Sequence, residues 1–129
     1  MRKIFVTSEL SPFTRGGIGR VMHNILKTMD DYDRQLTTLI VVDCKIDATR
    51  FATIFPGIML ICLDTKMNDP FLANYPLHPP REAFTHNQWL WKSQFILRSI
   101  LNISDILSVG YIEFPDWGAL PPPSIAIFI

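Results

Sequence analysis

SELSPFTRGGIGRV, residues 8–21, leads from a short apolar segment into a helical pattern through a glycine-rich turn. Glycine lets the backbone approach a ligand closely, because no Cβ stands in the way. The first N–H groups of a helix lack intrahelical acceptors and lie at the positive end of the helix dipole. Arg15 precedes the glycines and Arg20 follows them. The stretch therefore predicts a site for an anion, most naturally a phosphate or diphosphate.

Strand and helix patterns alternate on either side of this turn. We expect strands over 3–8, 36–42, 58–63 and 105–109, and helices over 18–29, 48–54 and 87–101. Alternating strands and helices with apolar strands are typical of a parallel sheet covered on both faces. The fold class predicted is α/β, a Rossmann-like and mostly parallel sheet with helices on both faces.

The first helix predicts one buried stripe, because its apolar residues recur at helical spacing. These residues are Ile18, Val21, Met22, Ile25, Leu26 and Met29. The acidic run at 30–33 then places negative charge at the negative end of the helix and predicts a turn. Residues 64–85 contain four prolines and predict a long loop.

Two motifs resemble one protein family. Residues 8–21 resemble the opening of GT-B glycosyltransferases, both the glycogen and starch synthases and the large retaining family that uses sugar nucleotides. A second segment, Tyr111-Ile112-Glu113-Phe114-Pro115-Asp116-Trp117-Gly118, is similar to one late in the N-terminal half of many members. The order of the two motifs and their wide separation make the pair more specific than either motif alone.

The resemblance implies that residues 1–129 are the single N-terminal, acceptor-side domain of a retaining GT-B enzyme. In the family, a C-terminal domain binds most of the donor, and the sugar passes from a nucleotide sugar to a glycan or another hydroxyl acceptor. The second domain is missing from the sequence, so we expect an incomplete half of the fold that transfers no sugar alone. An uncovered cleft face further predicts self-association.

The resemblance also assigns the donor-facing residues. Gly16 and Gly17 would bring backbone amides to the diphosphate, and the Ile18 N–H would be a third donor. Arg15 would clamp phosphate oxygens in bidentate fashion, although the synthases carry a lysine and a threonine in a turn one residue longer. Alternatively, the glycines only pack the helix against the sheet, and Arg20 is a solvated residue of its first turn.

Acidic residues near strand ends are the acceptor-side candidates. Glu9, Glu113 and Asp116 would accept hydrogen bonds from sugar hydroxyls, although such residues equally cap helices and turns. Trp117 would stack on a sugar or pack beside Pro115. The separation of the carboxylates in sequence does not define a catalytic pair, so no catalytic residue is assigned.

Composition excludes several other classes. The 129 residues form one domain with balanced charge, 12 basic and 12 acidic residues. The sequence contains no basic stripe interleaved with aromatic residues, so nucleic-acid binding is not expected. No secretory signal or membrane span is apparent, which predicts a cytoplasmic protein. Cys44 and Cys62 read as reduced packing residues of interior strands. His23, His78 and His86 lack metal-ligand spacing and read as surface residues, so neither a metal nor a cofactor is expected.

Two other functions remain open. Gly17-Ile18-Gly19 begins the pattern of an NAD(P)-binding Rossmann domain, and Asp43 after the second strand would meet a ribose hydroxyl. Met22, however, stands at the third glycine position, and the segment before Gly16 is longer than the usual tight turn. The other alternative is a noncatalytic remnant or interaction module that keeps the fold without the reaction.

Overall fold

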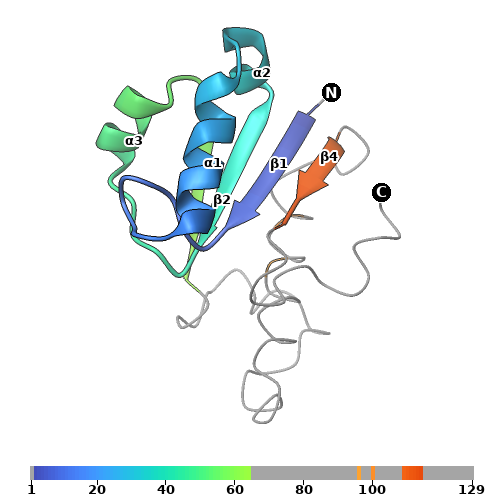
Figure 1. The fold of residues 1–129 in the computed structure, drawn as a ribbon. Helices are drawn as coiled ribbons and strands as arrows, with labels where there is room; N and C mark the ends of the chain where they lie inside the picture. Colours follow the sequence, from blue (N-terminus) through green and yellow to red (C-terminus); the bar gives the residue numbers. More distant parts are fainter. Residues whose placement is uncertain (1, 65–95, 97–99, 101–108, 115–129) are drawn as a thin grey trace, which may run out of the picture.

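The structure, a computed structural model, describes residues 2–64, 96, 100 and 109–114. These form β1 (Arg2–Thr7), α1 (Gly17–Thr28), α2 (Asp31–Gln35), β2 (Thr37–Val42), α3 (Ala48–Ile54), β3 (Met59–Leu63) and β4 (Val109–Glu113). The strands form one parallel sheet in the order β3-β2-β1-β4 (Figure 1). The predicted Rossmann-like α/β fold is confirmed.

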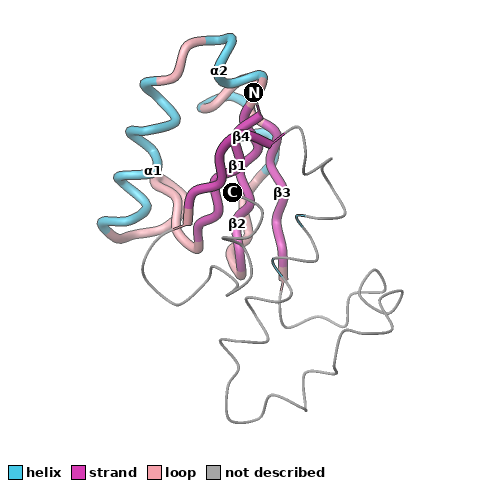
Figure 2. The backbone as a smooth tube through the Cα atoms, turned by 90° about the vertical axis from the view of Figure 1, so that its right-hand side faces the viewer, coloured by secondary structure: helices cyan, strands magenta, loops and turns pink. Residues whose placement is uncertain are grey.

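The two central strands β1 and β2 bury residues on both of their faces, as their apolar runs require. Figure 2 shows α1 on one side of the sheet. That side holds a core of Phe5, Leu10, Met22, Leu26, Leu39, Val41, Phe51, Phe55 and Ile58. The opposite side holds a core of Ile4, Val6, Ile40, Val42, Ile96 and Ile100. Ile96 and Ile100 are both helical, so helical residues cover each face.

The buried stripe of α1 is narrower than predicted. Gly19, Met22 and Leu26 are the buried residues of this helix, while the predicted Val21 is 59% exposed. Neighbouring helical residues are about 100° apart around the axis, so Val21 faces away from the sheet that Met22 contacts. The expectation that Val21 is buried is therefore wrong.

Aspartate side chains start the two short helices. Asp47 Oδ1 accepts hydrogen bonds from the N–H groups of Thr49 and Arg50, which begins α3 at the predicted residue. Asp30 Oδ1 accepts from Asp33 N at 2.7 Å and begins α2 in the same way. The acidic run therefore starts a new helix, where negative charge is favourable, and the predicted simple turn is wrong.

The strand predicted at 105–109 overlaps the described strand β4 at Val109. Residues 105–108 are outside the described residues, and β4 runs from Val109 to Glu113. Arg2 pairs with Val109 and Lys3 with Tyr111, so Gly110 is an extra residue that forms a bulge. The first residues of the second motif, 111–113, therefore lie inside this strand.

The order of the strands places a reversal between β1 and β4. From β1 the chain proceeds to β2 and β3 toward one edge of the sheet, whereas β4 pairs with the other side of β1. All four carboxyl ends point to the same edge, the lower one in Figure 1. Open α/β sheets bind ligands outside this edge, at such a reversal.

Several expectations fall outside the described residues. These are the loop 64–85 beyond Asp64, the helix 87–101 except at Ile96 and Ile100, and everything after Phe114. Within the described residues, no helix is both long enough and apolar enough to cross a membrane.

Candidate functional site

The connection between β1 and α1 folds back onto the first turn of the helix. Leu10 is fully buried, its N–H donates to Thr14 Oγ1 at 2.9 Å, and its carbonyl accepts from Thr14 N at 2.8 Å. Ser11 N–H donates to the carbonyl of Gly19 at 3.1 Å. These bonds fix the approach of the chain to the glycines, which the sequence pattern alone did not indicate.

The three glycines of the turn have different roles. Gly16 is the N-cap of α1 with φ 132°, a conformation that favours glycine, and no side chain caps the helix. A Cβ on Gly19 would lie 3.1 Å from the backbone nitrogens of Leu10 and Ser11. A Cβ on Gly17 would meet nothing within 4 Å. The described fold therefore accounts for two of the glycines and leaves open space beside Gly17.

Glu9 lies at the amino-terminal end of α1. Its N–H donates to Thr7 Oγ1 at 3.1 Å, and the Thr7 hydroxyl donates to its carbonyl at 2.8 Å. Thr7 is fully buried, so this pair of bonds holds the Glu9 backbone firmly. The side chain then reaches Gly16, where Oε1 would be 2.7 Å from an added Cβ. The structure thus brings a predicted acceptor-side carboxylate against a predicted donor-facing glycine.

Arg15 and Arg20 are exposed on either side of the glycines. Arg20 N–H donates to the Gly16 carbonyl at 3.3 Å, which closes the first turn of α1. Neither guanidinium forms an ion pair with a described residue. Ile18 is partly buried. The turn therefore combines free positive charge with the helix end, opposed by the Glu9 carboxylate.

His23 contributes to this region, although the sequence suggested a surface residue. Its Nδ1 lies 2.8 Å from the carbonyl oxygen of Ser11, which requires the proton on Nδ1. Its ring meets Phe55 edge to face, with centroids 5.2 Å apart. The partly buried side chain thus ties the loop before α1 to α1 and to the end of α3. No sequence signal locates the Ser11 carbonyl, so this role was missed.

Of the second motif, the structure describes the part that ends β4. Glu113 is the last residue of this strand and pairs with Phe5 of β1. It is partly buried and has interactions of its own. Phe114 packs against the core around Ile4. Asp116 and Trp117 lie outside the described residues. The first motif therefore follows β1 directly, and the second begins in β4, the strand that pairs with β1.

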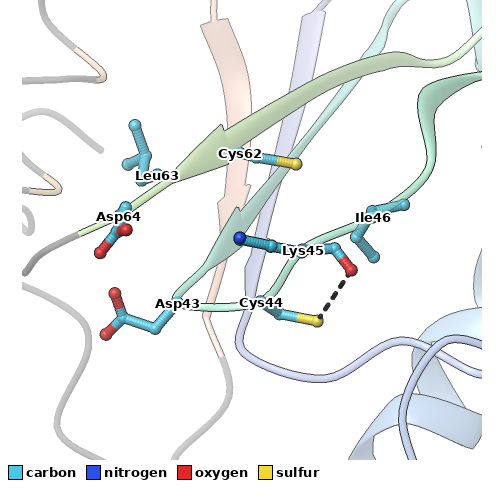
Figure 3. A pocket seen from close by; sticks show the side chains of 7 residues that line it. All are labelled: Asp43, Cys44, Lys45, Ile46, Cys62, Leu63 and Asp64. Atoms are coloured by element: carbon cyan, nitrogen blue, oxygen red, sulfur yellow. Dashed lines mark hydrogen bonds between the residues drawn. The ribbon is translucent and has the colours of Figure 1, made fainter.

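A cavity of about 500 Å³ lies at the carboxyl ends of β2 and β3. The described residues that line it are Asp43, Cys44, Lys45, Ile46, Cys62, Leu63 and Asp64. Figure 3 shows the two carboxylates on one side, the two sulfur atoms on the other, and the Lys45 nitrogen between them. Asp43 has φ 57° and donates its N–H to the Leu63 carbonyl at 2.8 Å. Its position directly after a strand was the only sequence signal for this site.

Both cysteines are free, as the sequence suggested, and Cys44 is partly buried and packs against the core. Cys62 is exposed because β3 is an edge strand of the described sheet, so the expectation that it packs in an interior strand is wrong. Burial raises the pKa of the Cys44 thiol above its ordinary value of 9.0, and the nearby Cys62 thiolate raises it further. At neutral pH Cys44 is therefore a protonated thiol, which lies 3.8 Å from the Lys45 carbonyl.

The described residues contain no group of three or more His, Cys, Asp or Glu side chains that could hold a metal ion. Comparisons of the chain with protein-family models, with curated proteins and with solved structures find no significant match. The two motifs and the geometry of the described site are therefore the features that indicate a function.

Proposed function

We propose that this chain is the acceptor-side N-terminal domain of a retaining GT-B glycosyltransferase. One observation carries the proposal. The two motifs that resemble this family are far apart in sequence, yet the first begins directly after β1 and the second begins within β4, the parallel strand that pairs with β1. The strand order reverses between these strands, and ligand sites of open α/β sheets lie there.

The donor-facing part of the proposed site is the start of α1. The amides of Gly17 and Ile18 belong to the uncapped first turn of the helix, and the open space beside Gly17 admits a phosphate oxygen to the backbone. Arg15 and Gly16 complete the set, with the guanidinium free of described ion pairs. In sugar transfer these groups would stabilise the departing nucleotide diphosphate, an electrostatic contribution that is often the largest one.

The acceptor-side part consists of carboxylates. Glu9 is held by Thr7 and lies against Gly16, so a hydroxyl bound by Glu9 would be next to a diphosphate bound at the turn. Such proximity is what a transfer between two substrates requires. Glu113 ends the neighbouring strand, while Asp116 and Trp117 remain predictions from the motif. The proposed ligands are a nucleotide sugar and a hydroxyl acceptor.

The NAD(P)-binding alternative has one observation in its favour, namely that Asp43 directly follows β2 beside the cavity. Met22 opposes it. This residue stands where the dinucleotide pattern requires its third glycine, and it is 6% exposed within the core between α1 and the sheet. The nine residues 8–16 between β1 and α1 also form a folded loop in place of a tight turn.

Ligand-induced stabilisation separates these functions. The melting temperature of the chain is measured with pyrophosphate, with glucose linked to UDP, ADP or GDP, and with NADH. The proposal predicts stabilisation by pyrophosphate and by at least one sugar nucleotide, and its loss in Gly17→Ala, whose added methyl fills the open space without touching the fold. Stabilisation by NADH alone supports the dinucleotide alternative. No response to any ligand contradicts both and supports a remnant or interaction module.

A further inference from the structure

We propose that Cys62 is a thiol-oxidation site and that Cys44 is its resolving thiol, so that the two residues form a reversible disulfide across the cavity at the ends of β2 and β3. The inference goes beyond the proposed function, because neither sugar transfer nor anion binding is part of it. The co-reactant is a small disulfide such as oxidised glutathione, which accepts the two electrons that the thiols lose.

The two thiols lie at neighbouring strand ends and line the same cavity. In the parallel pairing of β2 with β3, Cys62 is opposite Val41. Soon after Val41 the chain leaves the strand direction at Asp43, whose φ is 57°, while the Asp43 N–H still donates to the Leu63 carbonyl at 2.8 Å. The turn that contains Cys44 therefore stays beside β3. Figure 3 shows both sulfur atoms on the same side of the cavity.

The two thiols also influence each other electrostatically. The Cys62 thiolate contributes to the raised pKa of Cys44, after the larger effect of burial. Solvent and salt largely screen exposed charges that are more than about 10 Å apart, so such an effect is typical of neighbouring groups. Both thiols are free. The proposal therefore concerns a pair of cysteines and not two unrelated ones.

The segment that contains Cys44 has room to complete the bond. Residues 43–47 belong neither to β2 nor to α3. The contact of the Cys44 thiol within this segment is a weak one, to the Lys45 carbonyl at 3.8 Å. Small changes of the backbone there would bring the Cβ atoms to the roughly 3.5–4.5 Å that a disulfide requires. β3 would not have to move, because the segment moves toward it.

Exposure assigns different roles to the two thiols. Cys62 is exposed and meets a small disulfide first, whereas Cys44 is partly buried and protonated at neutral pH. The Cys62 thiolate attacks one sulfur of oxidised glutathione, and a glutathione thiolate leaves. Cys44 then loses its proton and attacks the Cys62 sulfur, and the second glutathione thiolate leaves. One oxidised glutathione thus becomes two glutathiones, which take up the two protons of the protein thiols.

The disulfide would change the connection between β2 and α3. It would tie this connection to β3 and close the side of the cavity on which the sulfur atoms lie (Figure 3). The shape of the cavity would then depend on the redox state of the thiols. We expect hydrogen exchange at the Lys45 and Ile46 amides to slow several-fold in the oxidised chain. Unchanged exchange at both amides would contradict the tethering of this connection.

A comparison of the folded and the unfolded chain tests whether the fold brings the thiols together. The intact chain is equilibrated at low concentration in glutathione buffers, with and without urea, and free thiols are then trapped with iodoacetamide. Peptide mass spectrometry measures the peptide pair linked through Cys44 and Cys62. The ratio of oxidised to reduced chain should be at least about tenfold higher in the folded state, the equivalent of about 1.4 kcal/mol. An equal or lower ratio in the folded chain would overturn the proposal, because the native geometry would then not favour the bond.

Two serine variants test the roles of the thiols. In Cys44→Ser no resolving thiol is present, so the mixed disulfide of Cys62 with glutathione should accumulate, whereas in the wild type it should remain a minor species. In Cys62→Ser the partly buried Cys44 should react several-fold more slowly than Cys62 does in Cys44→Ser. Equal amounts of mixed disulfide in the wild type and in Cys44→Ser would contradict the resolving role, as would faster reaction of Cys44. If a variant does not fold, the wild-type comparison decides.

These experiments fail independently of the proposed function. Oxidised glutathione tests the thiol pair, whereas pyrophosphate and sugar nucleotides test the glycine turn. Stabilisation by pyrophosphate in a chain that forms no Cys44 to Cys62 bond would refute the thiol pair alone. Formation of this bond in a chain that responds to neither pyrophosphate nor sugar nucleotides would support the thiol pair and refute the glycine-turn proposal alone.

Discussion

The Glu9 carboxylate lies against Gly16 at the start of α1, so close that a methyl group on Gly16 would meet Oε1 at 2.7 Å. The negative side chain therefore occupies the positive end of the helix without forming a cap hydrogen bond. This contact has two opposite consequences, since it stabilises the helix and repels an anion that approaches the same turn.

Glu9→Gln separates these consequences. We expect the variant to lose about 0.3–1 kcal/mol of stability, because a favourable charge at the helix end is removed. We also expect pyrophosphate to bind more tightly, because the repelling carboxylate is gone. Chemical denaturation gives the first quantity and isothermal titration gives the second. Weaker pyrophosphate binding in this variant would show that Glu9 does not oppose an anion at the turn.

The three glycine-to-alanine variants should differ in stability. Gly17→Ala gains up to about 0.5–1 kcal/mol, because alanine is the better helix former and no atom obstructs its methyl group. Gly16→Ala loses about 1–3 kcal/mol, because φ 132° is strained for any residue with a Cβ. Gly19→Ala loses about 1–2 kcal/mol, because the added methyl group would lie 3.1 Å from the backbone nitrogens of Leu10 and Ser11. Thermal denaturation checks the order, and equal stability of all three would contradict the described turn.

Thr7 is expected to position Glu9 through its hydroxyl group. Thr7→Val keeps the shape of the side chain but leaves the N–H and carbonyl of Glu9 without their partner, at a cost of about 1–3 kcal/mol. Thr7→Ser keeps the hydroxyl and loses one buried methyl group, at about 1 kcal/mol. The comparison of their denaturation midpoints is the test. A valine variant as stable as the serine variant would mean that these bonds contribute nothing.

The corrected stripe of α1 predicts different effects for two apolar residues of this helix. Leu26→Ala leaves a cavity in a fully buried position and should cost about 2–5 kcal/mol. Val21→Ala removes a side chain that is 59% exposed and should change stability by less than about 0.5 kcal/mol. Urea denaturation of both variants checks this. A large loss of stability in Val21→Ala would contradict the exposed position of Val21 and support the broader stripe that the periodicity predicts.

Cys44 predicts a loss of stability in alkaline solution. Its pKa in the folded chain is raised above 9.0, so the folded chain keeps a proton that the unfolded chain loses as the pH rises past that value. This contribution is fully present below the unfolded pKa and is lost as the pH rises through the folded pKa. As the pH rises past 9.0, Cys44→Ser should therefore lose less stability than the wild type. Parallel pH slopes in the two proteins would contradict the shift.

Local chemistry explains which parts of the fold are predictable from sequence. The helix at 48–54 has an aspartate cap, and the strands at 37–42 and 59–63 are continuous apolar runs, so each element carries its own signal. The glycine turn is equally local. The short helix α2 is not predicted, because the acidic run at 30–33 also disfavours continuation of α1. Asp30 nevertheless caps the start of this next helix.

The remaining errors concern contacts between distant segments. The burial of Val21 depends on how α1 is rotated on the sheet, and the exposure of Cys62 depends on β3 being an edge strand. The bulge at Gly110 depends on the pairing of β4 with β1. The hydrogen bond of His23 depends on the fold of the loop that contains Ser11. The cavity is formed by the ends of two strands that are separated in sequence, so the sequence indicates Asp43 alone of its lining residues.

The most direct test of the central claim follows the backbone amides of the glycine turn. The chain is titrated with glucose linked to UDP, ADP or GDP, and the resonances are observed by heteronuclear NMR. The proposal predicts saturable shifts of the Gly17 and Ile18 amides with at least one of these ligands, and their loss in the folded Gly17→Ala variant. Unchanged Gly17 and Ile18 resonances at saturating ligand, or shifts that persist in Gly17→Ala, would contradict it.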